Sequence, residues 1–241
     1  MRILVIGSGG REHALCWKIK QSRLVTEIFC APGNAGISKD ATCVDIQATE
    51  IERLLQFAKK NNIDLTVVGP EIPLTLGLVD VFEKEGLKVF GPSKAAAELE
   101  GSKVFSKNFM KRHGIPTAEY RTFTDREDAL DFIRTIKSPF VVKADGLAAG
   151  KGVILCSSIS EGEDAVRSIM SDRVFGDAGN SIIVEEFLTG QEASIFVITD
   201  GEKYLLLEPS QDHKAAYNDD KGPNTGGMGA YCPAPSIIKP I

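Results

Sequence analysis

The chain has 241 residues, of which 43% are hydrophobic and 25% charged, and this size and balance predict a soluble globular protein of about two domains. Its net charge of −5 disfavours a nucleic acid or an anionic membrane as the main partner, because phosphate groups attract clustered Lys and Arg. The five cysteines are scattered and form no Cys-x-x-Cys pair, and no apolar run approaches the ~20 residues that cross a bilayer. Since no signal peptide opens the chain, we expect a cytoplasmic protein.

The first half of the chain alternates apolar runs with helical patterns. Strands are expected at 2–6, 27–31, 64–68 and 87–90, and helices up to about Lys20, at 49–60 and near 76–85. This alternation predicts a parallel, doubly wound sheet, which is an α/β Rossmann-like fold. Each expected strand runs into a loop of small residues, and sheets of this kind bind ligands at the carboxyl ends of their strands.

A different pattern follows a Lys-rich helical connection at 93–113, where Gly114-Ile115-Pro116 interrupts the chain. We place the domain boundary at about 93–115. The strands expected in the second half lie at 140–144, 152–156, 182–185, 193–198 and 204–208. Their length and spacing favour an α+β domain with antiparallel strands.

Two Ser/Thr-x-x-Glu patterns in the second half are typical of capping boxes at helix starts. Thr124 with Glu127 predicts a helix near 125–137. Ser160 with Glu163 predicts one near 161–171.

The loop Gly7-Ser8-Gly9-Gly10-Arg11-Glu12 resembles a dinucleotide-binding fingerprint in part. Glu12 stands where a third glycine is required, and the second strand ends in Ala31-Pro32 without the acidic residue that grips a ribose. A glycine-rich loop leading into a helix also binds anions through backbone N–H groups, and Arg11 adds positive charge. We therefore favour a phosphorylated small molecule over NAD(P), with a simple tight turn as the remaining alternative.

The segment from Lys143 to Val153 places a lysine in an apolar strand, followed by a loop of glycine and alanine. It lacks the residue order and the following helix of a P-loop. Burying a lysine without a counter-charge is costly, and a nucleoside triphosphate would supply one while the loop covers its phosphates. A lysine facing solvent is the alternative, but it does not explain the small residues that follow.

Two later segments also carry polar groups. The apolar strand before Glu185 and Glu186 can offer backbone groups to an adenine edge, with Glu192 near a ribose, although simple solvation of these acids is an alternative. The stretch 211–231 is dense in glycine and predicts a long loop, either functional or disordered. Its single histidine has no metal-ligand spacing, and His13 and His113 are interpreted as structural or surface residues.

Together these segments are similar to the glycinamide ribonucleotide synthetase family of ATP-grasp ligases. The similar stretches are 7–14, 32–36, 69–74, 143–152, 185–188, 211–214 and 222–231. The resemblance implies a Rossmann-like domain over 1–102 and an ATP-grasp domain over 103–241, incomplete at its C-terminus, with a smaller lobe at about 116–190. It also implies that ATP, glycine and 5-phosphoribosylamine give glycinamide ribonucleotide, ADP and phosphate through a glycyl phosphate.

The resemblance implies roles for individual residues as well. Those implied to bind ATP are Lys103, Lys143, Gly146, Gly150, Gly152, Glu185, Glu186, Phe187, Leu188, Glu192 and Asn224. Those implied to bind the other substrates are Gly9, Gly10, Arg11, Asn34, Glu71, Asp212, Thr225 and Gly226. Lys143 and Asp212 are the implied catalytic groups. The implied cofactors are ATP and Mg²⁺ or Mn²⁺.

The chain departs from the family pattern in two respects. Ala215 follows Lys214 where the family usually has Arg, which removes one expected phosphate or substrate contact. The family's magnesium ligands lie beyond Ile241, so we expect no metal ligand within this chain and no activity from it alone. The partners expected are small molecules only, with a monomer or weak homo-oligomer, and a non-catalytic nucleotide-binding relative is the alternative.

Overall fold

The computed structural model describes residues 1–147, 152–219, 221–235 and 237, without the side chains of Pro223 and Asn224. The chain divides into two compact units, Met1–His113 and Gly114–Ile241. This division does not test the domain boundary expected after residue 102, which stays a prediction. Within the described ranges, no helix is long and apolar enough to span a membrane.

The first unit is built on a five-stranded parallel sheet with the order β3-β2-β1-β4-β5. Its strands are β1 (Arg2–Gly7), β2 (Glu27–Pro32), β3 (Thr42–Cys43), β4 (Leu65–Val68) and β5 (Val89–Phe90). The predicted parallel sheet is confirmed. Chain order reverses between β1 and β4, so the loops after these strands lie at the switch point where such sheets bind ligands.

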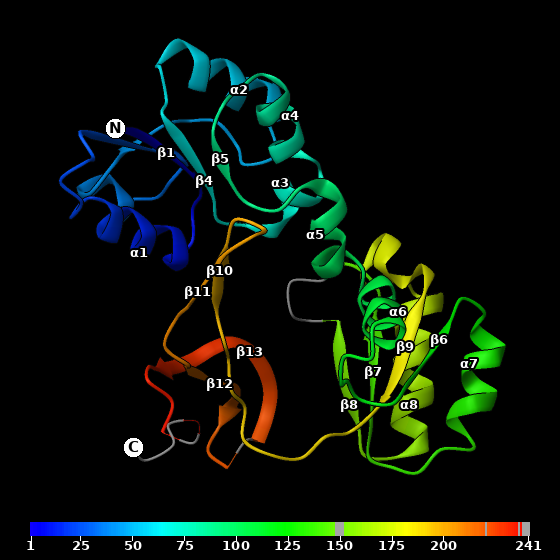
Figure 1. The fold of residues 1–241 in the computed structure, drawn as a ribbon. Coiled ribbons are helices and arrows are strands. Elements are labelled where there is room, and N and C mark those ends of the chain that lie inside the picture. The colour runs from blue at the N-terminus through cyan, green and yellow to red at the C-terminus, as the bar shows by residue number, and fades with distance from the viewer. Residues whose placement is uncertain (148–151, 220, 236, 238–241) are drawn as a thin grey trace. The chain divides into compact units, whose positions relative to one another are not determined.

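Helices cover both faces of this sheet. The helices of the first unit are α1 (Gly10–Ile19), α2 (Ile51–Lys60), α3 (Glu71–Thr75), α4 (Leu78–Lys84), α5 (Lys94–Gly101) and α6 (Lys103–Arg112), with a 3-10 turn at Ile37–Lys39. Alternate residues of β1 face opposite sides, so that Leu4 packs with residues of α2 and α4 while Val5 packs with Cys16 of α1. Figure 1 shows α1 and the α2–α4 pair on opposite sides of the strands.

The helix predicted near 76–85 corresponds to α4, and the short helix α3, which was not predicted, precedes it. Gly77 lies between α3 and α4 with a left-handed φ of 88°, a conformation that favours glycine. The chain therefore turns at Gly77 before α4 begins, which the apolar pattern alone does not reveal.

The second unit contains a four-stranded sheet with the order β6-β9-β7-β8, in which every pairing is antiparallel. Its strands are β6 (Tyr120–Phe123), β7 (Phe140–Ala144), β8 (Val153–Cys156) and β9 (Ile182–Glu186). One face packs against α7 (Arg126–Ile133), α8 (Ile159–Val166) and the turns Arg167–Ser171 and Gly176–Asn180. Phe140, Val142 and Ala144 belong to this core, so Lys143 points to the opposite face.

Both predicted capping boxes are wrong, although the helices exist. The N-cap of α7 is Asp125, whose side chain accepts the backbone N–H groups of Glu127 and Asp128. The N-cap of α8 is Ser158, which accepts the Glu161 amide. Ser158-x-x-Glu161 is the same pattern as Ser160-x-x-Glu163 shifted by two residues, and packing of the apolar face decides between them.

The long loop predicted over 211–231 is also wrong, because this stretch forms an antiparallel ribbon of β12 (Gln211–Tyr217) and β13 (Lys221–Tyr231). The register shifts twice, and Gly222 and Gly227 have φ values of 85° and 121°. Positive φ at these glycines gives an irregular ribbon in place of a regular strand pair. The preceding strands β10 (Val197–Thr199) and β11 (Tyr204–Leu206) pair with each other and correspond to the strands predicted at 193–198 and 204–208.

Candidate functional site

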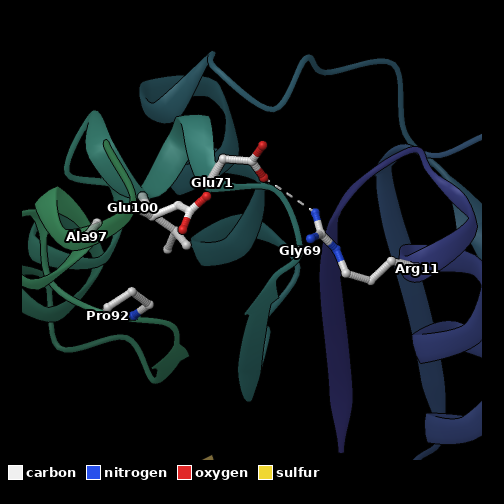
Figure 2. Close-up of a pocket in the computed structure, with 7 residues that line it drawn as sticks. Arg11, Gly69, Glu71, Pro92, Ala97 and Glu100 are labelled. Atoms are coloured by element: carbon white, nitrogen blue, oxygen red, sulfur yellow. Dashed lines mark ion pairs between the residues drawn. The ribbon is translucent and has the colours of Figure 1, made fainter. Parts of the chain in front are cut away.

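A cavity of about 380 Å³ lies in the first unit at the carboxyl ends of its strands. Three charged side chains line it, from Arg11 of α1, Glu71 of α3 and Glu100 of α5, and the remaining lining residues are apolar or glycine. Figure 2 shows the Arg11 guanidinium and the Glu71 carboxylate directed toward each other. Arg11 and Glu71 were predicted to bind substrate, whereas nothing in the sequence singled out Glu100.

Arg11 is held by two carboxylates. Its Nε donates to Glu12 Oε1 at 2.8 Å, and its Nη2 lies 3.7 Å from Glu71 Oε2. The Glu12 side chain is only 4% exposed, while that of Arg11 is 58% exposed. Because Glu12 Oε2 also accepts the Gly9 N–H at 2.7 Å, this amide is already bound within the protein.

Glycines surround the Glu12 side chain. A Cβ at Gly69 would lie 2.2 Å from Glu12 Oε1, and one at Gly7 would lie 2.6 Å from its Cγ. These two positions follow or end the central strands β4 and β1, so both strands leave room for the carboxylate. A Cβ at Gly10 would meet no described atom within 4 Å, so packing does not account for glycine there.

Asn34 ties two loops of the first unit together. Its Nδ2 donates to the Ser8 carbonyl at 2.6 Å, and its Oδ1 accepts the amides of Gly36 and Ile37 at 2.7 and 2.9 Å. Neither Asn34 nor Gly9 nor Gly10 is among the residues that line the cavity. The polar atoms of Asn34 are thus engaged in shaping the glycine-rich loop.

In the second unit the structure brings together two residues predicted to bind ATP. Lys143 Nζ on β7 donates to Glu185 Oε2 on β9 at 2.9 Å, and their side chains are 25% and 5% exposed. The inference that Lys143 needs a phosphate as its counter-charge is wrong, because Glu185 supplies one. The side chain remains accessible enough for its ammonium to meet a further anion.

The loop after Lys143 is anchored at both ends. Ala144 N–H donates to the Gly152 carbonyl at 2.8 Å, and Asp145 accepts from Ser181 Oγ at 3.1 Å and from the Gly146 amide at 3.0 Å. Gly146 has a φ of 93°, a conformation that glycine adopts without strain. Gly150, which was predicted to cover phosphates, lies outside the described residues.

The segment after Glu185 is exposed. Glu186 is tied to Glu119 in both directions, since its carboxylate accepts the Glu119 amide at 2.9 Å and its own amide donates to the Glu119 carbonyl at 3.0 Å. Phe187 and Leu188 are 40% and 63% exposed. Their backbone and side chains are therefore available to a planar ligand. Lys103 begins α6 of the first unit.

A charged group forms on the β12–β13 ribbon and the segment before it. Lys214 Nζ hydrogen-bonds the Glu192 carboxylate and lies 3.6 Å from Asp212 Oδ1. Burial opposes the charged form of Lys214, but the hydrogen bond and charge of Glu192, with Asp212, raise its pKa. Glu192 and Asp212 were predicted site residues, and Lys214 between them was not assigned a role.

Thr225 of β13 bonds both strands of this ribbon. Its Oγ1 donates to the Lys214 carbonyl at 2.9 Å and accepts the Gly227 amide at 3.0 Å. A Cβ at Gly226 would meet no described atom within 4 Å. Asn224 pairs with Ala215 across the ribbon through its backbone, and its side chain is outside the description.

Sequence reasoning missed Glu12 and the contact of Lys214 with Glu192. Glu12 could have been found, because Gly9-x-x-Glu12 is the spacing at which a glutamate bonds the amide before a helix. Lys214 could not, because its contact with Glu192 joins residues 22 positions apart. Among the described residues, no group of three or more His, Cys, Asp or Glu side chains is placed to hold a metal ion.

The antiparallel sheet that carries the lysine–glutamate pair lies in a segment, residues 101–241, that matches an ATP-grasp domain, so the chain is an ATP-grasp protein. The family profiles agree with this class. The profile "Phosphoribosylglycinamide synthetase, N domain" matches residues 1–100, and "Phosphoribosylglycinamide synthetase, ATP-grasp (A) domain" matches residues 101–241. The chain belongs to the phosphoribosylglycinamide synthetase family.

Curated relatives match along the whole chain. A phosphoribosylamine–glycine ligase from Salmonella typhi is 56% identical over 243 aligned positions, which cover 100% of this chain and 57% of the relative. One from Rhodopirellula baltica is 56% identical and covers 98% of this chain and 55% of the relative. The chain therefore spans a little over half the length of these relatives.

Solved structures support the same fold. A phosphoribosylamine–glycine ligase from Thermotoga maritima matches with a TM-score of 0.80 and 33% identity, over 97% of this chain and 56% of that chain. A biotin carboxylase domain from Hydrogenobacter thermophilus, solved with MgADP and bicarbonate, matches with a TM-score of 0.71 and 19% identity, over 88% and 50%. At that identity the second match shows the fold alone.

Proposed function

We propose that the protein joins glycine to 5-phosphoribosylamine at the expense of ATP, through a glycyl phosphate, and gives glycinamide ribonucleotide, ADP and phosphate. The observation that carries this proposal is the match along the whole chain to relatives named phosphoribosylamine–glycine ligase, at 56% identity. Family membership contradicts the NAD(P)-dependent oxidoreductase considered from the glycine-rich loop. We further propose a cytoplasmic location, small-molecule partners only, and a monomer or weak homo-oligomer.

In this proposal the second unit binds the nucleotide. Lys143 meets the phosphates, and its contact with Glu185 orients its ammonium before they arrive. The loop from Gly146 to Gly152, with Gly150 within it, covers the phosphates, while Glu186, Phe187 and Leu188 line the adenine. The nucleotide makes further contacts with Lys103, Glu192 and Asn224.

Glu192 has two roles in this account. Before the nucleotide binds, its carboxylate is occupied by Lys214. A ribose hydroxyl can donate a hydrogen bond to the remaining lone pairs of the same carboxylate, since an ionised glutamate accepts about four hydrogen bonds. Lys214 then adds positive charge near the reacting groups.

The first unit binds the ribosylamine. The Arg11 terminal nitrogens donate to phosphate or hydroxyl oxygens, and Glu71 accepts from hydroxyl or amine groups. The amide of Gly10 can be approached closely because no Cβ stands there. Gly9 and Asn34 act through the shape of the loop.

Asp212 of β12 and the Thr225–Gly226 segment of β13 face the glycine and the acyl phosphate in this proposal. A carboxylate near the glycine ammonium orients it so that the carboxylate end meets the nucleotide. Positioning and charge neutralisation of this kind make up most of the catalysis in phosphoryl transfer. Magnesium would neutralise the charge of the nucleotide phosphates. Since the described residues contain no fitting ligand group, we derive no step through it.

The proposal is tested by coupled ADP release from the full-length protein with ATP and magnesium. ADP should form only when glycine and 5-phosphoribosylamine are both present. Lys143→Ala should lower this rate at least a hundredfold, about 3 kcal/mol of transition-state stabilisation. Lys203→Ala, which removes an exposed lysine of the same unit, should leave it within twofold. ADP release that does not depend on glycine would contradict the proposal.

A further inference from the structure

The Glu12 carboxylate lies where the start of α1 would otherwise receive an anion. Its Oε2 accepts the Gly9 N–H at 2.7 Å, and the residue is 3% exposed. The start of a helix favours negative charge, and here the chain supplies that charge itself. The glycine-rich loop therefore offers a ligand the Arg11 side chain rather than the Gly9 amide.

Two strands of the sheet make room for this carboxylate. A Cβ at Gly69, directly after β4, would lie 2.2 Å from Glu12 Oε1, and a Cβ at Gly7, at the end of β1, would lie 2.6 Å from Glu12 Cγ. A Cβ atom does not come this close to a non-bonded atom in a real protein, so neither position has room for a side chain beside Glu12. Glu12 and the two glycines thus fit together as one packed group. Glu12 is therefore fixed in place.

Arg11 receives its orientation from this fixed group. Glu12 Oε1 accepts from Nε at 2.8 Å, on the inner edge of the guanidinium. The terminal nitrogens stay on the side of the cavity, where Nη2 lies 3.7 Å from Glu71 Oε2 (Figure 2). An exposed arginine samples many rotamers, and a fixed acceptor at Nε selects one of them before a ligand binds.

We propose that Glu12 is a positioning residue for this cavity. It fixes the Arg11 guanidinium so that the terminal nitrogens meet the phosphate or hydroxyl oxygens of a phosphorylated sugar, and it does not contact the sugar itself. The identity of that sugar as 5-phosphoribosylamine rests on the proposed function. Glu71 and Glu100 complete the cavity as acceptors for hydroxyl or amine groups.

The test uses calorimetric titration of the full-length protein with ribose 5-phosphate, a stable sugar phosphate, and in parallel with ATP. Glu12→Ala should weaken ribose 5-phosphate binding at least tenfold and leave ATP binding within twofold. Glu12→Gln, which keeps one acceptor and the shape, should weaken it only about threefold. The double variant Glu12→Ala/Arg11→Ala should bind no more weakly than Arg11→Ala, because Glu12 acts only through Arg11.

The chain contains a matched control at the amino ends of β1 and β2, away from the cavity at the carboxyl ends. Arg2 Nε donates to Glu27 Oε2 at 2.9 Å, so this pair has the same atoms and nearly the same distance as Arg11 and Glu12. Glu27→Ala should leave both affinities within twofold. A loss of ribose 5-phosphate binding in Glu27→Ala would show that any arginine–glutamate pair of this sheet matters, which overturns the specific role of Glu12.

Thermal melting separates folding from binding. If Glu12→Ala does not melt cooperatively, Glu12→Gln and Gly69→Ala decide, since Gly69→Ala displaces Glu12 without removing its charge. Both should weaken ribose 5-phosphate binding and not ATP binding. Additive losses in the double variant, or parallel losses of ATP binding, would show a structural role and overturn the proposal.

The outcome is independent of the proposed function. Ribose 5-phosphate binding that depends on Glu12, in a protein without glycine-dependent ADP release, would refute the ligase activity and leave Glu12 as a positioning residue. A wild-type protein that turns over 5-phosphoribosylamine but does not bind ribose 5-phosphate in this cavity would refute the assignment of Glu12.

Discussion

Each unit pairs a buried carboxylate with a more exposed cation, but the two pairs are built differently. In the first unit, Glu12 and Arg11 are neighbours in sequence, and their side chains are 4% and 58% exposed. In the second unit, Glu185 and Lys143 lie 42 residues apart on adjacent strands, and their side chains are 5% and 25% exposed. The first pair joins residues of a single helix, whereas the second depends on the pairing of β7 with β9.

This difference teaches how each cation can act. Glu12 also binds a loop amide and is enclosed by glycines, so Arg11 is a rigid donor with a fixed geometry. Lys143 carries a compact ammonium on a flexible stem, and three donors let it keep Glu185 while it meets a phosphate. A rigid guanidinium suits recognition of a sugar phosphate, and a flexible ammonium suits phosphates that change during a reaction.

The largest expected effect concerns the packing around Glu12. Gly7→Ala should lower the free energy of unfolding by about 3 kcal/mol, because Gly7 has a φ of 126° and the added Cβ would overlap Glu12. Gly10→Ala, in the same loop but with open space, should change it by no more than about 0.5 kcal/mol. Urea denaturation measures both. Equal effects would show that Glu12 is not tightly packed.

A smaller effect on stability should distinguish the Lys143–Glu185 pair from the Arg11–Glu12 pair. Lys143→Met should destabilise the protein by about 2 kcal/mol, since it leaves the Glu185 charge buried, and the partial exposure of Lys143 reduces the usual cost. Arg11→Met should cost only about 1 kcal/mol, because Glu12 keeps the Gly9 amide. Thermal melts of both variants check this order. A greater loss from Arg11→Met would reverse the comparison.

The smallest effect concerns the helix starts of the second unit. Ser158→Ala should cost about 1 kcal/mol, because Ser158 accepts the Glu161 amide at the start of α8. Ser160→Ala removes the same atoms from an exposed position inside the helix and should change the stability by less than about 0.5 kcal/mol. If Ser160→Ala has the larger effect in urea denaturation, the capping box predicted from the sequence is the right one.

Much of the fold could be predicted, because apolar runs report burial directly. The predicted strand at 140–144 has the same bounds as β7. The helix starts were harder to predict from the sequence, since Ser158 and Ser160 both precede a glutamate by three residues and only packing distinguishes them. The β12–β13 ribbon was missed because its glycines signal a loop equally well.

The candidate site divides in the same way. Glu12 lies three residues after Gly9, so its bond to that amide is a local property that the sequence contains, although it was interpreted as a mismatch to a dinucleotide fingerprint. The Lys143–Glu185 contact depends on strand register, since Val141 faces Glu185 across β7 and β9 and brings Lys143 within reach. Register is set by packing of the whole sheet, and a single strand does not encode it.

The most direct test of this account is a pair of calorimetric titrations of the full-length protein, with ATP and with ribose 5-phosphate. The account predicts a double dissociation: Lys143→Ala weakens ATP binding at least tenfold and leaves ribose 5-phosphate binding within twofold, while Arg11→Ala does the reverse. If both variants weaken the same ligand, or if neither weakens the ligand assigned to it, the assignment of nucleotide and sugar to separate units is contradicted.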